Sequence, residues 1–142
     1  MFADVEADIY VMADGDQTYH AASAPRMIKQ LIGERLDMVV ARRQPADEAH
    51  GAYRLGHETG NRAMTRFVAR LFGESFTDIF SGYRVFSRRF VKSFPSFATG
   101  FEIETELTVH ALELGLPVAE TPSPYNARPE GSVSKLSTIG DG

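Results

Sequence analysis

The sequence predicts an α/β domain in which helices flank a mixed sheet. Short apolar runs rich in β-branched and aromatic residues alternate with stretches whose apolar residues recur at helical spacing. The runs at 8–13 and 36–41 enclose one such helical stretch, which predicts a βαβ unit with a right-handed crossover. Both runs end in charged residues, as buried parallel strands do where their carboxyl ends open into a ligand crevice.

Length and composition are those of one globular domain. The 142 residues are 43% hydrophobic and 24% charged, and the absence of cysteine excludes disulfides and thiolate metal sites. A net charge of −4 argues against nucleic-acid partners. Residues 42–92 nevertheless carry ten of the fifteen Lys and Arg against five acids, which indicates that one face meets an anion. No apolar run reaches the roughly 20 residues of a membrane span.

The first apolar run ends in Asp14-Gly15-Asp16. Two neighbouring carboxylates repel each other unless a cation lies between them, and Mg²⁺ is typically held by one or two carboxylates together with substrate phosphates. Asp-Gly-Asp is also ordinary turn chemistry. With Thr18, the pattern D-x-D-x-T is in addition the signature of haloacid-dehalogenase phosphatases, in which Asp14 would be the nucleophile. Spacing alone leaves a metal site, a turn and a phosphatase open.

A helix follows this acidic loop. Ser23 can cap it, Pro25 suits its first turn, and its apolar face consists of Met27, Ile28, Leu31 and Ile32. The strand after the helix ends at Arg42-Arg43. Because the carboxyl ends of parallel strands share one rim of a sheet, we expect Arg43 to lie near Asp14 and Asp16.

The longest helical pattern runs over 52–72 and is closed by Gly73. Beside its apolar stripe lies a mostly cationic stripe made of Arg54, Glu58, Arg62, Arg66 and Arg70. A basic amphipathic helix of this kind can lie on an anionic membrane surface or bind an anionic substrate. The alternative is an ordinary solvent-exposed helix face with no binding function.

A second group of polar residues lies in the stretch 76–87, which reads FTDIFSGYRVFS. Gly82 permits a sharp turn, Asp78 could act as a base or orient an attacking group, and Arg84 could face a phosphate. Taken alone, the same residues also fit a turn capped by an aspartate and an arginine on an edge strand.

The last third of the chain contains a helix, a short strand and a polar tail. In the helix at 100–114, Glu102 and Glu106 share one face with Glu104 turned away, and this pair could hold a sugar hydroxyl or a metal. Acids in a first turn also simply complement the helix dipole. After a strand at 118–121, the tail carries cations, hydroxyls and a glycine, an inventory that can fold over a diphosphate.

Four segments, taken together, resemble the GT-A family 2 glycosyltransferases, most nearly the dolichyl- or polyprenyl-phosphate sugar transferases. These segments are VMADGDQTY, TDIFSGYRVFSR, GFEIETELTVHALELGLPVAETPSPY and RPEGSVSKLST. Their joint occurrence is more specific than any one motif and disfavours the phosphatase. The resemblance implies that 1–142 is a single, truncated GT-A domain without the N-terminal nucleotide-binding strands, and that 126–142 is a flexible loop that closes over a diphosphate.

The resemblance also implies a donor site. Asp14 and Asp16 would hold Mg²⁺ or Mn²⁺ on the diphosphate of a UDP- or GDP-sugar, with Asp16 and Asp78 as the catalytic carboxylates. The remaining donor contacts would come from Arg43, Arg128, Ser132 and Lys135.

The implied acceptor is a lipid phosphate at a membrane surface. Its contacts would come from Arg54, Arg62, Arg84 and Glu102. The protein would then be cytoplasmic and peripheral to the inner face of the membrane. An exposed edge at the first strand favours a homo-oligomer. A non-catalytic or oligomerising fragment of such an enzyme is the alternative.

Overall fold

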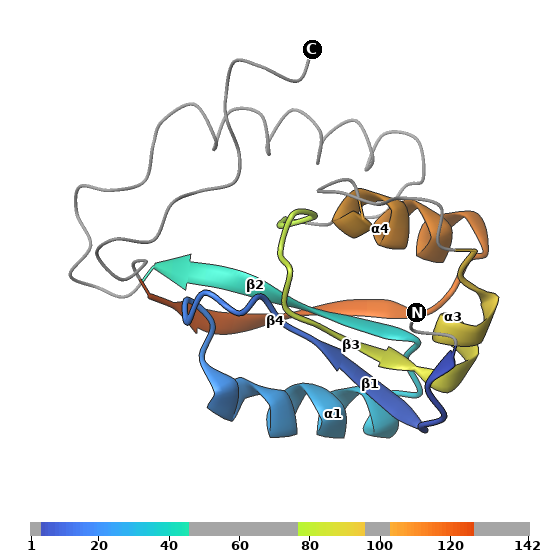
Figure 1. Ribbon diagram of the computed structural model, residues 1–142, viewed down its shortest axis with the longest axis horizontal. Coiled ribbons are helices and arrows are strands. Elements are labelled where there is room, and N and C mark those ends of the chain that lie inside the picture. Colours follow the sequence, from blue (N-terminus) through green and yellow to red (C-terminus); the bar gives the residue numbers. More distant parts are fainter. Residues whose placement is uncertain (1–3, 46–76, 96–102, 127–142) are drawn as a thin grey trace, which may run out of the picture.

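The computed structural model describes residues 4–45, 77–95 and 103–126. In this part of the chain a four-stranded mixed sheet has the order β1-β3-β2-β4, with helices on both faces (Figure 1). The strands are β1 Ile9–Met12, β2 Met38–Pro45, β3 Arg84–Ser87 and β4 Val118–Tyr125. The helices are the 3₁₀ turn η2 Ala21–Ser23, α1 Ala24–Gly33, α3 Arg88–Ser93 and α4 Ile103–Glu113. The expected mixed α/β sheet is confirmed.

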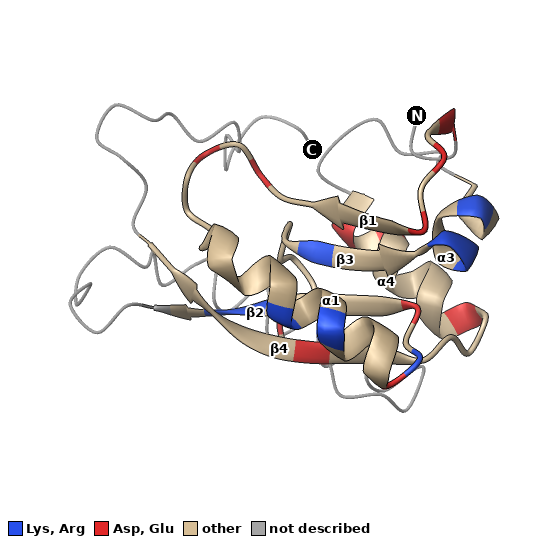
Figure 2. Ribbon diagram, turned by 90° about the horizontal axis from the view of Figure 1, so that it is seen from below, with Lys and Arg blue, Asp and Glu red and all other residues tan. Residues whose placement is uncertain are grey.

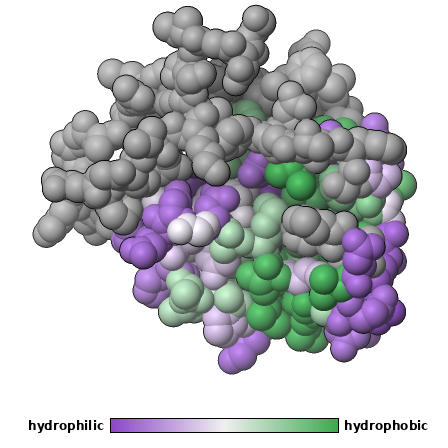
Figure 3. Space-filling model, in the orientation of Figure 1, coloured by the Kyte–Doolittle hydropathy of each residue, from purple (hydrophilic) through white to green (hydrophobic). Residues whose placement is uncertain are grey.

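The strand order differs from a simple βαβ unit. β3 lies between β1 and β2 and is antiparallel to both, so β1 and β2 run in the same direction and end at the same edge of the sheet. The expected common rim is therefore correct. The expectation of a buried parallel first strand is wrong, because β1 pairs antiparallel with β3 and Val11 is 46% exposed. Apolar surface gathers over the region where β1 runs (Figure 3).

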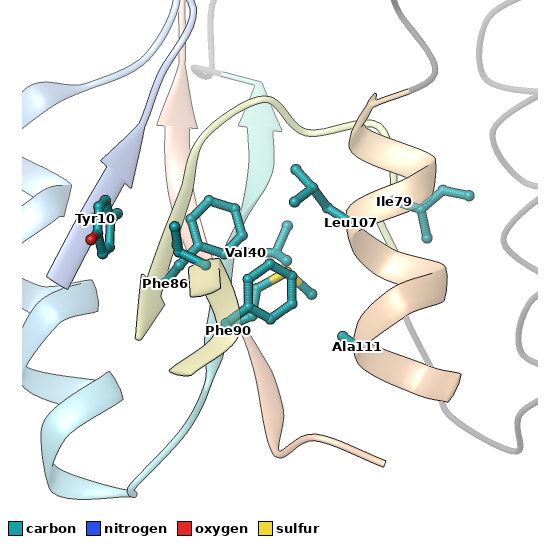
Figure 4. Packing of buried hydrophobic residues seen from close by; sticks show 9 residues of the cluster. Tyr10, Val40, Ile79, Phe86, Phe90, Leu107 and Ala111 are labelled. Carbon is teal, nitrogen blue, oxygen red and sulfur yellow. The ribbon is translucent and has the colours of Figure 1, made fainter. Parts of the chain in front are cut away.

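The core consists of two clusters, one on each face of the sheet. Because side chains of a strand alternate between faces, Met38 and Val40 point to one cluster and Val39 and Ala41 to the other. The first cluster fills the space between the sheet and α4, with Phe86, Phe90, Leu107 and Ala111 (Figure 4). The second lies under α1, around Met27, Leu31, Tyr83 and Val85. In β2, Met38, Val39, Val40 and Ala41 are all fully buried, which explains the uninterrupted apolar run in the sequence.

The strands β2 and β4 extend further than the sequence predicts. They pair in parallel from Met38 opposite Val118 through Arg43 opposite Ser123 to Pro45 opposite Tyr125. β4 is an outer strand of the described sheet, where prolines without an N–H are tolerated. The paired extension carries Arg43 and Tyr125 past the apolar part of the sheet.

Several expected features fall outside the described residues, namely the helix at 52–72 and the tail after residue 126. Within the described ranges, no helix has the length and apolar character needed to cross a membrane.

Candidate functional site at the carboxyl edge of the sheet

The acidic loop after β1 packs against the turn that precedes β3. A Cβ built on Gly82 would lie 2.6 Å from Oδ2 and 2.9 Å from Cγ of Asp14, so this carboxylate lies directly over the Gly82 Cα. The Gly82 N–H donates a hydrogen bond of 2.9 Å to the hydroxyl of Tyr19. Gly82 has no left-handed φ, so its role is to admit the Asp14 carboxylate and not to make a special turn. Figure 2 shows acidic residues on the loop from β1 to α1.

Asp16 shapes the loop that it belongs to. Its Oδ1 accepts hydrogen bonds from the N–H and the hydroxyl of Thr18, at 3.2 and 2.6 Å. Gln17 between them has a left-handed φ of 63°, and Thr18 is buried. These hydrogen bonds form the turn that D-x-D-x-T allows, in the loop that follows β1 and also carries Asp14.

Arg43 and Asp78 form a bidentate pair at the same edge. The Arg43 side chain donates to both Asp78 oxygens, with Nε and Nη2 each at 2.7 Å, and the Arg43 amide donates to Oδ2 at 3.2 Å. The side chains are only 20% and 7% exposed, respectively. The Arg43 guanidinium also lies 5.5 Å from the ring centroid of Tyr125. This geometry makes Asp78 the partner that orients Arg43, which is neither of the two roles predicted for it, a base or a group that orients an attacking group.

Arg84 lies in the core and not at the site surface. It is fully buried, and its guanidinium donates to the carbonyls of Ser81 and Ile79 and to Oγ1 of Thr108. Burial lowers its pKa to about 10, while the Glu104 carboxylate opposes this shift. The expected contact between Arg84 and an acceptor phosphate is wrong. Its guanidinium instead holds the backbone of the turn before β3.

Glu104, predicted to lie on a different helix face from Glu102 and Glu106, lies near the acidic loop. Glu104 is half-buried; burial raises the pKa of its carboxyl, the Asp14 carboxylate raises it further, and the Arg84 and Arg43 charges lower it. Glu104 therefore lies within electrostatic reach of both the acidic loop and Arg43. The signal in the sequence is Leu107, which faces the core one turn after Glu104 and fixes the register of α4.

Tyr19 is a second residue that sequence reasoning missed. Its ring lies 5.3 Å from those of Tyr83 and Tyr125, and burial raises the pKa of its hydroxyl to about 12, with the Arg43 charge among the influences that oppose the rise. The hydroxyl therefore remains neutral at physiological pH and can serve as the acceptor for the Gly82 N–H.

The acids of the site fit a hard divalent cation bound together with a ligand. Among the described residues, no group of three or more His, Asp or Glu could hold a metal ion by itself. Mg²⁺ and Mn²⁺ prefer oxygen ligands, and Mg²⁺ sites are commonly built from one or two carboxylates completed by phosphate oxygens and water. Asp14 and Asp16 supply such a set, and Gly82 leaves room for one of them.

The other predicted site residues lie outside the described part of the chain and stay predictions. They are Arg54, Arg62, Glu102, Arg128, Ser132 and Lys135.

Sequence comparison finds named glycosyltransferases. No protein-family model matches the chain. It is 38% identical over 138 residues to the glycosyltransferase AglJ of Haloferax volcanii, covering 97% of this chain and 45% of that protein. It is 30% identical over 142 residues to the low-salt glycan biosynthesis hexosyltransferase Agl6 of the same organism, covering 99% and 34%. The chain thus spans less than half the length of these relatives.

Solved structures show the same fold. The glucosyl-3-phosphoglycerate synthase of Mycobacterium tuberculosis in complex with phosphoglyceric acid superposes with a TM-score of 0.67 at 24% identity, covering 94% of this chain and 45% of that one. The same enzyme in complex with Mn²⁺ and UDP-glucose gives 0.67 at 23% identity and the same coverage. The chain therefore has the fold of the GT-A glycosyltransferases and resembles glycosyltransferases in sequence over nearly its whole length.

Proposed function

We propose that this chain is the part of a metal-dependent inverting glycosyltransferase that holds the donor diphosphate and receives a polyprenyl-phosphate-type acceptor. The observations that carry the proposal are the Asp14 carboxylate over Gly82, the Asp16–Thr18 turn and the Arg43–Asp78 pair, which belong to segments at the edge of the sheet where β1 and β2 end. The similarity to AglJ and Agl6 supports the reaction class. A fold shared with an enzyme solved with Mn²⁺ and UDP-glucose supports a nucleotide-sugar donor.

On the donor side, Asp14 and Asp16 would hold Mg²⁺ or Mn²⁺, which when bound neutralises the diphosphate. Gly82 leaves room for the Asp14 carboxylate, and Asp16 accepts hydrogen bonds from Thr18. Arg43, already aligned by Asp78, offers positive charge to the nucleoside diphosphate as it departs. Fixed charges of this kind stabilise the transition state without reorganisation at the moment of reaction.

On the acceptor side, a phosphate oxygen is already anionic and needs little help from a general base. This agrees with the structure, because both oxygens of Asp78 accept hydrogen bonds from Arg43. Catalysis then depends mainly on positioning and electrostatic stabilisation. The phosphoglyceric acid in the related synthase is also a phosphate compound. We choose a lipid phosphate because the predicted basic helix at 52–72 suits an anionic membrane surface.

Calorimetry with a panel of nucleotide sugars, with and without Mn²⁺, tests the proposal. We expect Mn²⁺-dependent binding of a UDP- or GDP-sugar that is lost in Asp16→Ala. If no nucleotide sugar binds while self-association or vesicle binding persists, the non-catalytic fragment is correct. Release of phosphate from a generic ester, abolished by Asp14→Asn, would instead establish the phosphatase.

A further inference from the structure

Glu120 on β4 holds the start of the turn that carries Asp78. Its Oε1 accepts hydrogen bonds from two successive backbone amides, Thr77 N–H at 2.8 Å and Asp78 N–H at 3.0 Å. Its Oε2 accepts a third from the Thr77 hydroxyl. A carboxylate that accepts from consecutive amides forms charge-assisted bonds and fixes the local backbone. Glu120 thus ties residues 77 and 78 to a strand more than forty residues away in the sequence.

The carboxylate of the same aspartate reaches back to the sheet. Asp78 is 5% exposed and accepts from the Arg43 side chain and amide, so its backbone is held by β4 and its side chain by β2. The two strands are hydrogen-bonded neighbours, with Glu120 opposite Val40 and Arg43 opposite Ser123. The contacts from Glu120 through Asp78 to Arg43 form one connected chain of charged groups across the end of the sheet.

This chain of contacts gives Glu120 a specific task. A free arginine side chain has many rotamers, and a bidentate partner restricts them only when that partner is itself fixed. We propose that Glu120 is a positioning residue, which fixes Asp78 so that Arg43 presents its guanidinium to the bound anion in one orientation. The proposal rests on the proposed function for its ligand, the nucleotide-sugar diphosphate. Glu120 itself need not touch that ligand, since its carboxylate already accepts three hydrogen bonds.

The experiment compares Glu120→Ala, Glu120→Asp and Glu120→Gln in the full chain. The direct readout is the ¹⁵N–¹H resonance of the Arg43 Nε–Hε group, identified by its loss in Arg43→Lys. We expect this resonance to shift or broaden in the Ala and Asp variants, because both withdraw the acceptor from the two amides. The Gln variant keeps a carbonyl oxygen at the same distance and should retain the wild-type signal. Mn²⁺-dependent nucleotide-sugar affinity should fall about tenfold in the Ala variant and recover in the Gln variant.

A matched control uses Thr121, the residue that follows Glu120 in β4. The Thr121 hydroxyl donates a hydrogen bond to Gln30 of α1, and Gln30→Ala removes that bond. It should change stability without moving the Arg43 resonance or the affinity.

Two results would overturn the proposal: an unchanged Arg43 resonance in both the Ala and Asp variants, or a Gln30→Ala variant that reproduces the Arg43 shift. Failure of the proposed function is distinguishable, since a wild-type chain that binds no nucleotide sugar still reports on Glu120 through the Arg43 resonance.

Discussion

Replacing Gly82 with alanine tests the contact on which the acidic half of the site depends. The added Cβ would lie 2.6 and 2.8 Å from the two Asp14 carboxylate oxygens. A comfortable non-bonded contact to carbon is about 3.5 Å, so the carboxylate must move by about 1 Å. The φ of Gly82 is not left-handed, so alanine meets no backbone penalty there and the effect is steric.

The size of the effect follows from the tolerance of metal sites. Metal–ligand distances hold to about 0.2 Å, and a displacement of about 1 Å at a reacting centre can reduce activity about 100-fold. Asp14 is exposed, so its carboxylate can move aside at little cost to folding. Disturbing a group that orients a metal ligand typically costs about 10–100-fold in metal affinity. We therefore expect Gly82→Ala to remain folded and to lose about 10–100-fold in Mn²⁺-dependent nucleotide-sugar affinity.

Calorimetry and urea unfolding measure the two quantities separately. Gly33→Ala is the control, because a Cβ at Gly33 meets nothing within 4 Å and the residue lies at the end of α1 away from the acidic loop. A Gly82→Ala protein with wild-type metal-dependent affinity would refute the assignment of Asp14 as a metal ligand that needs the space left by Gly82.

Three further predictions concern buried groups of the site. Arg84→Leu should destabilise the fold by about 2–5 kcal/mol in urea unfolding, because it leaves the buried carbonyls of Ser81 and Ile79 without the hydrogen bonds that the guanidinium donates. A loss below about 1 kcal/mol would contradict this. The pKa of Tyr19 is raised from 10 to about 12, so its contribution to stability is complete below pH 10 and lost as the pH rises from about 10 to 12. Tyr19→Phe should therefore lose less stability than wild type between pH 9 and 12, and parallel curves would be the contrary result. The pKa of Glu104 is raised by burial, so the charged carboxylate disfavours folding above its usual pKa. Glu104→Gln should raise the unfolding midpoint at pH 7 but not at pH 3.

The sequence predicted the parts of this fold that depend on local signals. The apolar runs located the strands, and the charged residues after β1 and within β2 predicted that Asp14, Asp16 and Arg43 meet at one edge. The order of strands was not predictable in this way, because β3 begins at Arg84 and inserts between β1 and β2, which end at Met12 and Pro45. Nothing in the local pattern of β1 or β2 records that insertion.

The errors at single residues have a similar cause. An arginine after a glycine turn suggests a surface position, and only the tertiary structure brings the Thr108 hydroxyl and two turn carbonyls around the Arg84 guanidinium. For α4, the spacing of Glu102 and Glu106 predicted a shared face, but spacing does not say which face meets the sheet. Leu107 settles that question, and it brings Glu104 toward the site.

The long pairing of β2 with β4 has a consequence for how an anion would be received. Arg43 is attached to a ribbon whose neighbour is in register from Met38 to Pro45, whereas the two aspartates are attached to a connecting loop. Arg43 is therefore preorganised, and little of its conformational freedom has to be lost when an anion binds. Any adjustment to ligands of different shape must come from the acidic side, so related chains that accept different sugars should differ in the loop and agree in the ribbon.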